Sequence, residues 1–89
     1  MIKVHRMSSP RSHAPVANQF IIIEDDGKTF QSYSSIIAKK FNDGRVHLDK
    51  DYWDYSSTTS KYRSEFLGEG TAETRKKIAS GEYVLINLN

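Results

Sequence analysis

Three aspartates close together, Asp49, Asp51 and Asp54, come nearest to the spacing of a metal site in this 89-residue chain. Their positions resemble the start of a calcium-binding loop. Such a loop also needs a glycine at its sharp turn and a bidentate glutamate at its last position, and neither is present at the required spacing. The three histidines are far apart and form no helical i,i+4 pair. We therefore expect the aspartates to form a turn and cap the next helix, with no metal and no cofactor.

Residues suited to catalysis are also scarce. His47 lies two positions before Asp49 and could act as a general base, but a strand histidine with an exposed polar edge is the simpler interpretation. Serine is abundant, yet there is no Gly-x-Ser-x-Gly elbow and no cysteine. The Gly68-Glu-Gly70 segment lacks the lysine and the preceding strand of a phosphate-binding loop. We expect that the protein is not an enzyme.

The remaining chemistry is aromatic and basic. Tyr52 and Trp53 could stack on nucleic-acid bases or insert as anchors into a protein partner, and basic residues further along could add positive charge. The candidate partner-binding residues are Tyr52, Trp53, Arg63, Arg75, Lys76 and Lys77. The alternative is structural: the aromatic residues form the core of a small domain, and the basic residues form a solvated face.

Length and composition restrict the class of protein. A chain of 89 residues with 37% apolar content can build one modest core, and so one domain. Thirteen basic against 11 acidic side chains exclude an acidic DNA mimic and only weakly favour a nucleic-acid binder. No apolar run approaches the roughly 20 residues that span a bilayer. The absence of cysteine and of a signal-peptide core predicts a soluble cytoplasmic protein.

Residues 1–15 differ from the rest of the chain. They contain Lys3, Arg6 and Arg11, two prolines and no acid. Ile2 and Val4 could start a short edge strand. One interpretation is a flexible basic N-terminal arm that reaches for phosphate, and the other is an ordinary solvated terminus that leads into the first strand. We divide the chain into this arm and a single α+β domain, residues 16–89.

The first half of the domain is predicted to be an antiparallel meander. Residues 16–24 are typical of a strand, and Asp26-Gly27 predicts a type I′ turn, in which φ is positive. Between residues 29 and 41 the alternation slips by one position, which predicts a bulge or bend at Ser34-Ser35. A second turn, 42–44, leads to another strand.

Two helices are predicted in the second half. Tyr55, Thr59, Tyr62 and Phe66 recur at intervals of four, three and four residues, which indicates one buried helical stripe. Ser56 or Ser57 can cap the beginning of this helix, and Gly68 can end it.

A second helix, capped by Thr71, should stop at Gly81. The last strand, 83–88, is apolar on both faces and is expected to lie centrally in the sheet, paired with a strand of the first half. The predicted fold is α+β: an antiparallel sheet of about four strands, a meander plus the C-terminal strand, with two short helices on one face.

Several blocks of the sequence, taken together, resemble the sequences of one known family. They are Pro15-Val-Ala-Asn-Gln-Phe20, Phe30-Gln-Ser-Tyr33, Ile36-Ile-Ala38, Tyr52-Trp-Asp-Tyr-Ser56, Thr58-Thr-Ser-Lys-Tyr-Arg63 and Phe66-Leu-Gly-Glu69. Together with the C-terminal residues they resemble a family of short bacteriophage proteins, an uncharacterised domain of unknown function. The resemblance covers residues 11–89 and implies a viral or prophage origin. It supplies no activity, cofactor or site residue.

Phage proteins of this size often act by binding host machinery, so the resemblance implies a partner class. Our leading hypothesis is a non-catalytic binding protein in the host cytoplasm that inhibits or modulates a host nucleoprotein machine, such as a CRISPR or other defence complex. The alternative is direct nucleic-acid binding through the basic helix residues and the N-terminal arm. Self-association is compatible with both.

Overall fold

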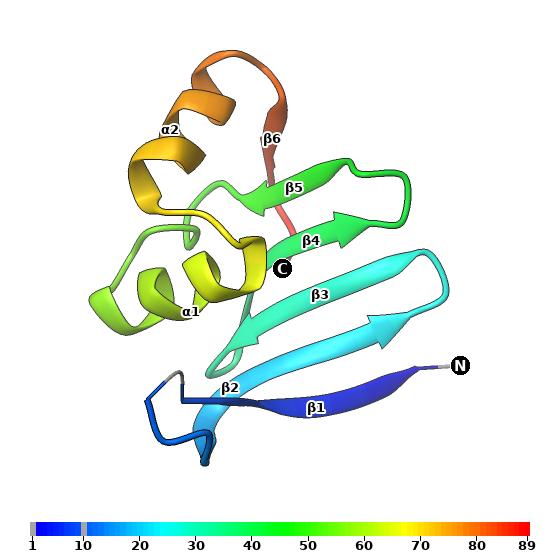
Figure 1. The fold of residues 1–89 in the computed structure, drawn as a ribbon. Helices are drawn as coiled ribbons and strands as arrows, with labels where there is room; N and C mark the ends of the chain where they lie inside the picture. Colours follow the sequence, from blue (N-terminus) through cyan, green and yellow to red (C-terminus); the bar gives the residue numbers. More distant parts are fainter. Residues whose placement is uncertain (1, 10) are drawn as a thin grey trace.

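The computed structural model describes residues 2–9 and 11–89, which form a six-stranded sheet and two helices (Figure 1). The strands are β1 (Lys3–Ser8), β2 (Pro15–Glu24), β3 (Gly27–Ser32), β4 (Ser35–Phe41), β5 (Val46–Asp49) and β6 (Tyr83–Ile86). The helices, α1 (Ser57–Leu67) and α2 (Thr71–Ala79), lie between β5 and β6. The α+β class is confirmed. Neither helix is long and apolar enough to cross a membrane.

The sheet is larger than predicted and is mixed. Its strand order follows the chain from β1 to β6, and every pair is antiparallel except β5 and β6, which are parallel. The prediction of about four antiparallel strands is therefore wrong in number and in direction. A parallel partner requires a long crossover connection, and α1 and α2 provide it.

One additional strand arises because the slip in alternation conceals a hairpin. Ser32 pairs directly with Ser35, and Tyr33 between them has φ 55°, so the chain reverses where the sequence predicted a bulge or bend. The bulge lies at Ile37 of β4, where the β3–β4 register shifts between Phe30 and Gln31.

The other additional strand is β1, which comes from the predicted arm. Residues 3–8 pair antiparallel with β2, so this part of the arm is an edge strand rather than a free segment. The short edge strand that Ile2 and Val4 could start is therefore confirmed, although β1 was not counted among the four predicted strands. Residues 1 and 10 of the predicted arm lie outside the described residues.

Gly27 is required for a reason other than the one predicted. The hairpin between β2 and β3 is confirmed, but Gly27 does not have a positive φ. Instead, a Cβ atom at this position would lie 2.3 Å from the carbonyl oxygen of Lys40. Gly27 is thus needed for the close approach of β4.

Helix α1 begins and ends where local rules place it. The Ser56 Oγ atom accepts a hydrogen bond from the Thr59 amide at 3.1 Å, and Gly68 ends the helix with φ 71°. Helix α2 begins one residue earlier than predicted, because Gly70 occupies the N-cap position and Thr71 is already helical.

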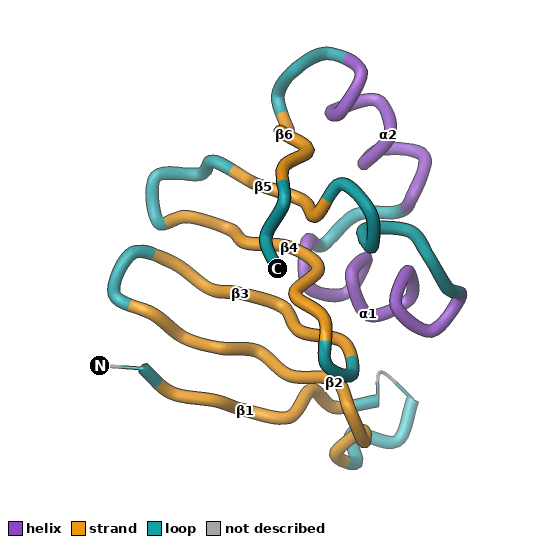
Figure 2. The backbone as a smooth tube through the Cα atoms, turned by 180° about the vertical axis from the view of Figure 1, so that it is seen from behind, coloured by secondary structure: helices purple, strands orange, loops and turns teal. Residues whose placement is uncertain are grey.

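Both helices cover the same face of the sheet, as Figures 1 and 2 show. The rings of Phe30 on β3 and Phe66 on α1 stack with centroids 5.8 Å apart. Tyr62 and Phe66 are buried as predicted, but Tyr55 precedes α1 and is 47% exposed, so its assignment to the core is wrong. The buried hydrophobic residues are Met7, Phe30, Ile37, Ala38, Val46, Leu48, Tyr62, Phe66 and Tyr83.

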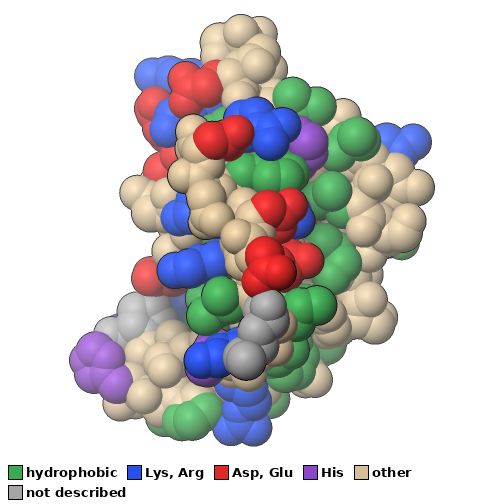
Figure 3. Space-filling model, turned by 90° about the vertical axis from the view of Figure 1, so that its right-hand side faces the viewer, with side chains coloured by type: hydrophobic (Ala, Val, Ile, Leu, Met, Phe, Trp, Pro, Cys, Tyr) green, Lys and Arg blue, Asp and Glu red, His purple; other side chains and the backbone are tan. Residues whose placement is uncertain are grey.

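The other face of the sheet is partly covered by the chain itself. In Figure 3, hydrophobic side chains form a band on the right, the side that the helices leave open. Lys39 reaches across this face to Asp26 at 2.9 Å. The side-chain amide of Asn89 accepts a hydrogen bond from the Ile36 amide at 2.7 Å and donates one to the Ile36 carbonyl at 3.0 Å. These two bonds extend the hydrogen-bonded edge of β4 beyond the end of β5.

The last strand differs most from its predicted position. Its pairing with a strand of the first half is confirmed, since β6 lies beside β5. However, β6 is at the edge of the sheet rather than in its centre. Val84, Leu85 and Ile86 are 46%, 41% and 43% exposed.

Candidate protein-binding surface

The connection between β5 and α1 is anchored by a buried carboxylate. Asp49 is 1% exposed, and its Oδ2 atom accepts hydrogen bonds from the amides of Asp51 at 3.1 Å and Tyr52 at 2.9 Å. Its Oδ1 atom accepts from the Leu88 amide at 2.8 Å. Asp49 therefore fixes the connection and the C-terminal segment to the same point.

These hydrogen bonds also keep Asp49 ionised. Burial raises the pKa of the Asp49 carboxyl, but hydrogen bonds from the Leu88 amide, the Asn89 side chain and the two amides of the connection lower it by more. The net pKa is below the ordinary value of 3.8. A charged acceptor is thus maintained at neutral pH.

A fully buried arginine fixes the other end of the connection. The Arg63 Nη1 atom donates to the Trp53 carbonyl at 2.6 Å and to Asp54 Oδ1 at 3.1 Å, and Nη2 donates to Thr71 Oγ1 at 2.6 Å. Arg63 is 0% exposed. Its guanidinium forms internal hydrogen bonds that join α1, the connection and the start of α2. It is therefore not part of the accessible surface, although its charge and position made it a candidate.

Two guanidinium groups contact the ring of Trp53. The Cζ atoms of Arg63 and Arg75 are each 5.1 Å from its ring, which is half-buried against the core. Asp54 joins the same group, because its Oδ2 atom accepts from Arg75 Nη2 at 2.5 Å. Burial raises the pKa of Asp54, but hydrogen bonds from Ser60 and Arg63 and both arginine charges lower it overall.

Two tyrosines project from this fixed connection. Tyr52 is 38% exposed and Tyr55 is 47% exposed, and their rings meet edge to face with centroids 5.4 Å apart. The sequence selected Tyr52 but assigned Tyr55 to the core. We refer to Tyr52, Trp53, Tyr55 and Arg75 as the aromatic surface.

The basic residues of α2 do not form one positive patch. The charge of Arg75 is matched by Asp54, and Lys77 Nζ lies 2.8 Å from Glu69 Oε1. That hydrogen bond raises the pKa of Lys77 well above its ordinary value. Lys76 is exposed on the outer side of the helix. Of the predicted set, the structure brings together only Tyr52, Trp53, Arg63 and Arg75.

Glu69 is an organising residue that the sequence did not reveal. Its carboxylate accepts from Thr74 Oγ1 at 2.7 Å, Lys77 Nζ at 2.8 Å and the Tyr83 hydroxyl at 2.7 Å. Burial raises the pKa of Glu69, and these three partners lower it overall, whereas burial beside Glu69 raises the pKa of Tyr83 to about 12. Nothing in the linear spacing indicates that α2 and β6 meet here.

A family model matches residues 2–81, which include the whole aromatic surface. It describes a family of unknown function, DUF8033. The chain belongs to this family. Comparisons with curated proteins and with solved structures found no match. Within this DUF8033 chain, the matched residues stop before β6.

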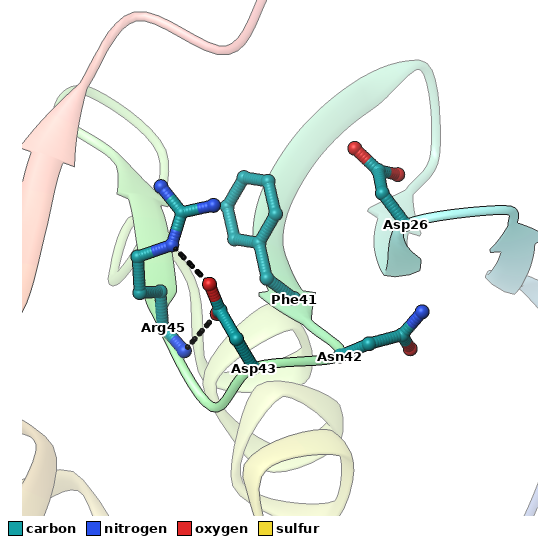
Figure 4. A pocket seen from close by; sticks show the side chains of 5 residues that line it. All are labelled: Asp26, Phe41, Asn42, Asp43 and Arg45. Atoms are coloured by element: carbon teal, nitrogen blue, oxygen red, sulfur yellow. Dashed lines mark hydrogen bonds and ion pairs between the residues drawn. The ribbon is translucent and has the colours of Figure 1, made fainter.

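The DUF8033 chain also has a shallow hollow of about 320 Å³ between its two hairpin turns (Figure 4). The Arg45 guanidinium lies 4.4 Å from the Phe41 ring, and its Nε atom donates to Asp43 Oδ2 at 2.8 Å. The Arg45 amide also bonds Asp43, which lowers the pKa of that carboxyl. A hydrogen bond from Lys39 lowers the pKa of Asp26. Both carboxylates therefore stay ionised at neutral pH and offer no proton for exchange.

Three lysines form a line on the helix-bearing face of the sheet. The register pairs Lys3 with Ile23, Ile23 with Lys28, and Lys28 with Lys40. Directly paired residues share a face, so the line extends from β1 to β4. Lys40 Nζ donates to the Phe66 carbonyl at 3.2 Å. None of the ion pairs among the described residues involves these three lysines.

Proposed function

We propose that this protein is a non-catalytic protein-binding domain and that the aromatic surface makes the central contact. The observation that carries the proposal is the exposure of Tyr52 and Tyr55 on a segment fixed by two buried charged residues, Asp49 and Arg63. Tyrosine, tryptophan and arginine are the residues most enriched among those that dominate binding energy.

Fixation of the connection supports this role energetically. Each side chain or loop that must become ordered on binding reduces the affinity. Here the main chain at Tyr52 and Trp53 is already held by Asp49 and Arg63 before any partner arrives. An interface on this surface therefore loses little conformational entropy.

Charge supports a protein partner at this surface. Arg75 and Arg63 share the single carboxylate of Asp54, so this group keeps only one net positive charge, and Arg63 is fully buried. Phosphate contacts depend on unbalanced positive charge. Tyrosine hydroxyls and apolar rings suit a surface of mixed polarity.

For the partner, we propose a host nucleoprotein machine, such as a CRISPR or other defence complex, which the protein inhibits or modulates by occupying its surface. This part of the proposal rests on the resemblance to short bacteriophage proteins, with the cytoplasm of the host as the place of action.

Site-directed photocrosslinking tests the contact. A benzoylphenylalanine introduced at Tyr55 should crosslink one defined protein in a host lysate, and the same group at Tyr33 should not. Tyr33 is a matched control because it is 51% exposed but lies at the β3–β4 turn. Tyr52→Ala with Tyr55→Ala should weaken the complex by about 1,000-fold, since central aromatic anchors contribute roughly 2 kcal/mol each.

Two outcomes would overturn the proposal. One is equal crosslinking from positions 55 and 33, and the other is a complex that survives the double tyrosine substitution in a folded protein. Tyr33→Ala should leave the complex unchanged.

A second candidate, direct nucleic-acid binding, is favoured by the line of Lys3, Lys28 and Lys40. Like charges directly opposite each other on neighbouring strands are destabilising, so Lys28 and Lys40 cost stability where they stand. Four strands span about 15 Å at about 4.8 Å per spacing, enough to follow several backbone phosphates.

Fluorescence anisotropy with labelled single- and double-stranded oligonucleotides at several salt concentrations tests this candidate. Three phosphate contacts predict a slope of about −2 for single strands in log K against log salt. Lys28→Gln should reduce the slope by about 0.7, while Lys50→Gln, an exposed lysine away from the line, should not. No binding at low salt would eliminate the candidate.

A further inference from the structure

Strand β6 has the composition of a covered strand but lies at the edge of the sheet. Edge strands of natural proteins usually carry a lysine, a proline or a bulge that prevents pairing with another chain. Residues 83–86 contain no charge and no proline, and their pairing with β5 is unbroken. Each of Val84, Leu85 and Ile86 is more than 40% exposed.

The register shows which backbone groups of β6 face outward. Ile86 pairs with Asp49, and its carbonyl accepts from the Lys50 amide at 3.0 Å, so its main-chain groups face β5. Successive residues of a strand direct these groups to opposite sides. The amide and carbonyl of Leu85 therefore face away from β5, as do those of Tyr83.

We propose that β6 pairs antiparallel with β6 of a second copy of this chain, about a two-fold axis at Leu85. Leu85 then lies opposite Leu85 of the second copy, and each amide donates to the other carbonyl. Tyr83 of each copy lies opposite Asn87 of the other. The main-chain groups of both residues point away from their own β5, so they can form hydrogen bonds on each side of the axis. Val84 of each copy lies opposite Ile86 of the other.

The charge pattern favours a second copy at this edge. A two-fold interface sets the strand against itself, so a strand whose charges all have one sign meets like charge. β6 has none, and its apolar residues meet apolar residues. The opposite edge, β1, carries Lys3, His5 and Arg6, and the same pairing there would bring basic residues together.

This inference is independent of the aromatic surface, which lies in the connection before α1. The double substitution Tyr52→Ala with Tyr55→Ala should therefore remain dimeric while losing its protein partner. The two proposals can fail separately.

Sedimentation velocity over a wide range of protein concentration tests the inference. The intact chain should reach twice its 10.2 kDa mass. Leu85→Lys should weaken the dimer by about 100-fold or more, because it places two like charges at the axis. Val4→Lys, at a 60% exposed position on β1, should leave the dimer intact.

Hydrogen exchange gives a second readout. The Leu85 amide should exchange more slowly as the protein concentration rises, and this protection should be absent in Leu85→Lys. If that variant does not fold, a chain with an N-methyl group on Leu85 keeps the side chain and removes the donor, and it should be monomeric.

Several results would overturn the inference. They are a monomer at every concentration, a dimer that persists in Leu85→Lys or in the N-methylated chain, and a dimer that Val4→Lys weakens as much as Leu85→Lys does. A chain that is monomeric alone but accepts a strand of another protein at β6 would also overturn it.

Discussion

Arg63 and Gln19 are both fully buried polar side chains, but their surroundings are opposite. Arg63 donates to a carbonyl, a carboxylate and a hydroxyl, and of its side-chain nitrogens Nε has no partner among residues 2–9 and 11–89. For Gln19, on β2, neither atom of the side-chain amide has a hydrogen-bond partner in the described part of the chain. A buried polar group stabilises a fold only when its hydrogen bonds are replaced. The difference indicates that Arg63 stabilises the fold, whereas the buried amide of Gln19 lowers its stability.

The largest expected effect is at Arg63. Arg63→Ala should lower the free energy of unfolding by about 3–5 kcal/mol, because it leaves the Trp53 carbonyl and Asp54 without their buried donor. Urea unfolding followed by tryptophan fluorescence measures this change. Arg75→Ala is the matched control: it shares Trp53 and Asp54 but is largely exposed and should cost far less. Equal losses in the two variants would contradict the comparison.

Asp49 should show the next largest effect, together with a pH dependence. Asp49→Asn should cost about 2 kcal/mol at neutral pH, because amide hydrogen bonds to a neutral acceptor are weaker. The folded pKa of Asp49 is lowered, so the unfolded state takes up the proton first as pH falls. Its stabilisation is present above the unfolded pKa of about 3.9 and is lost as pH falls through the folded pKa.

Thermal unfolding measured between about pH 6 and pH 2 checks this dependence. The slope below about pH 4 should be smaller in Asp49→Asn than in the unsubstituted protein. Asp51→Asn, at an exposed position of the same connection, is the control. An unchanged slope in Asp49→Asn would show that other carboxylates govern acid unfolding.

At Gln19 the expected effect is smaller and opposite in sign. Gln19→Met keeps the length of the side chain and removes two unpaired polar atoms, so it should stabilise the protein by about 1 kcal/mol. Gln31→Met is the control, because the Gln31 amide donates to the Tyr33 carbonyl at 2.7 Å and its removal should give no gain. Destabilisation by Gln19→Met would mean that the amide is satisfied in solution.

The smallest effect is expected at Arg45, which also lies over an aromatic ring beside an aspartate. Its side chain is 63% exposed, so solvent and salt screen the interaction. Arg45→Ala should leave the midpoint of urea unfolding unchanged within error. A clear loss would show that geometry, rather than burial, sets the strength of these arginine contacts.

The sequence predicted the features that depend on a few neighbouring residues. Ser56 caps the beginning of α1 and Gly68 its end, as predicted, because capping depends on local hydrogen bonds and local backbone dihedral angles. The turn at Gly44, which has a positive φ, was found for the same reason. The turn at Asp26 was located correctly, although Gly27 does not have the positive φ that the prediction assumed. The buried stripe of Tyr62 and Phe66 followed from helical spacing, which failed only at Tyr55, one residue before the cap.

Features that depend on distant residues could not be predicted. Exposed and central strands look alike in sequence when both are apolar, so β6 was placed at the wrong position in the sheet. Arg63 was expected at the surface because its partners, Trp53 and Thr71, meet it only through tertiary packing. The hydrogen bond from the Tyr52 amide to Asp49 is local, but the bond that ties Asp49 to the Leu88 amide joins residues 39 positions apart.

The parallel pairing of β5 and β6 has a consequence for the order in which the protein folds. Each of the four strands β1 to β4 pairs with the next strand along the chain, so short loops close these pairs at little entropic cost. β6 can join only after the chain has crossed about 33 residues between Asp49 and Tyr83. We expect the meander to form the folding nucleus and β6 to dock after the rate-limiting step. Substitutions in β3 should then slow folding, whereas those in β6 should mainly accelerate unfolding.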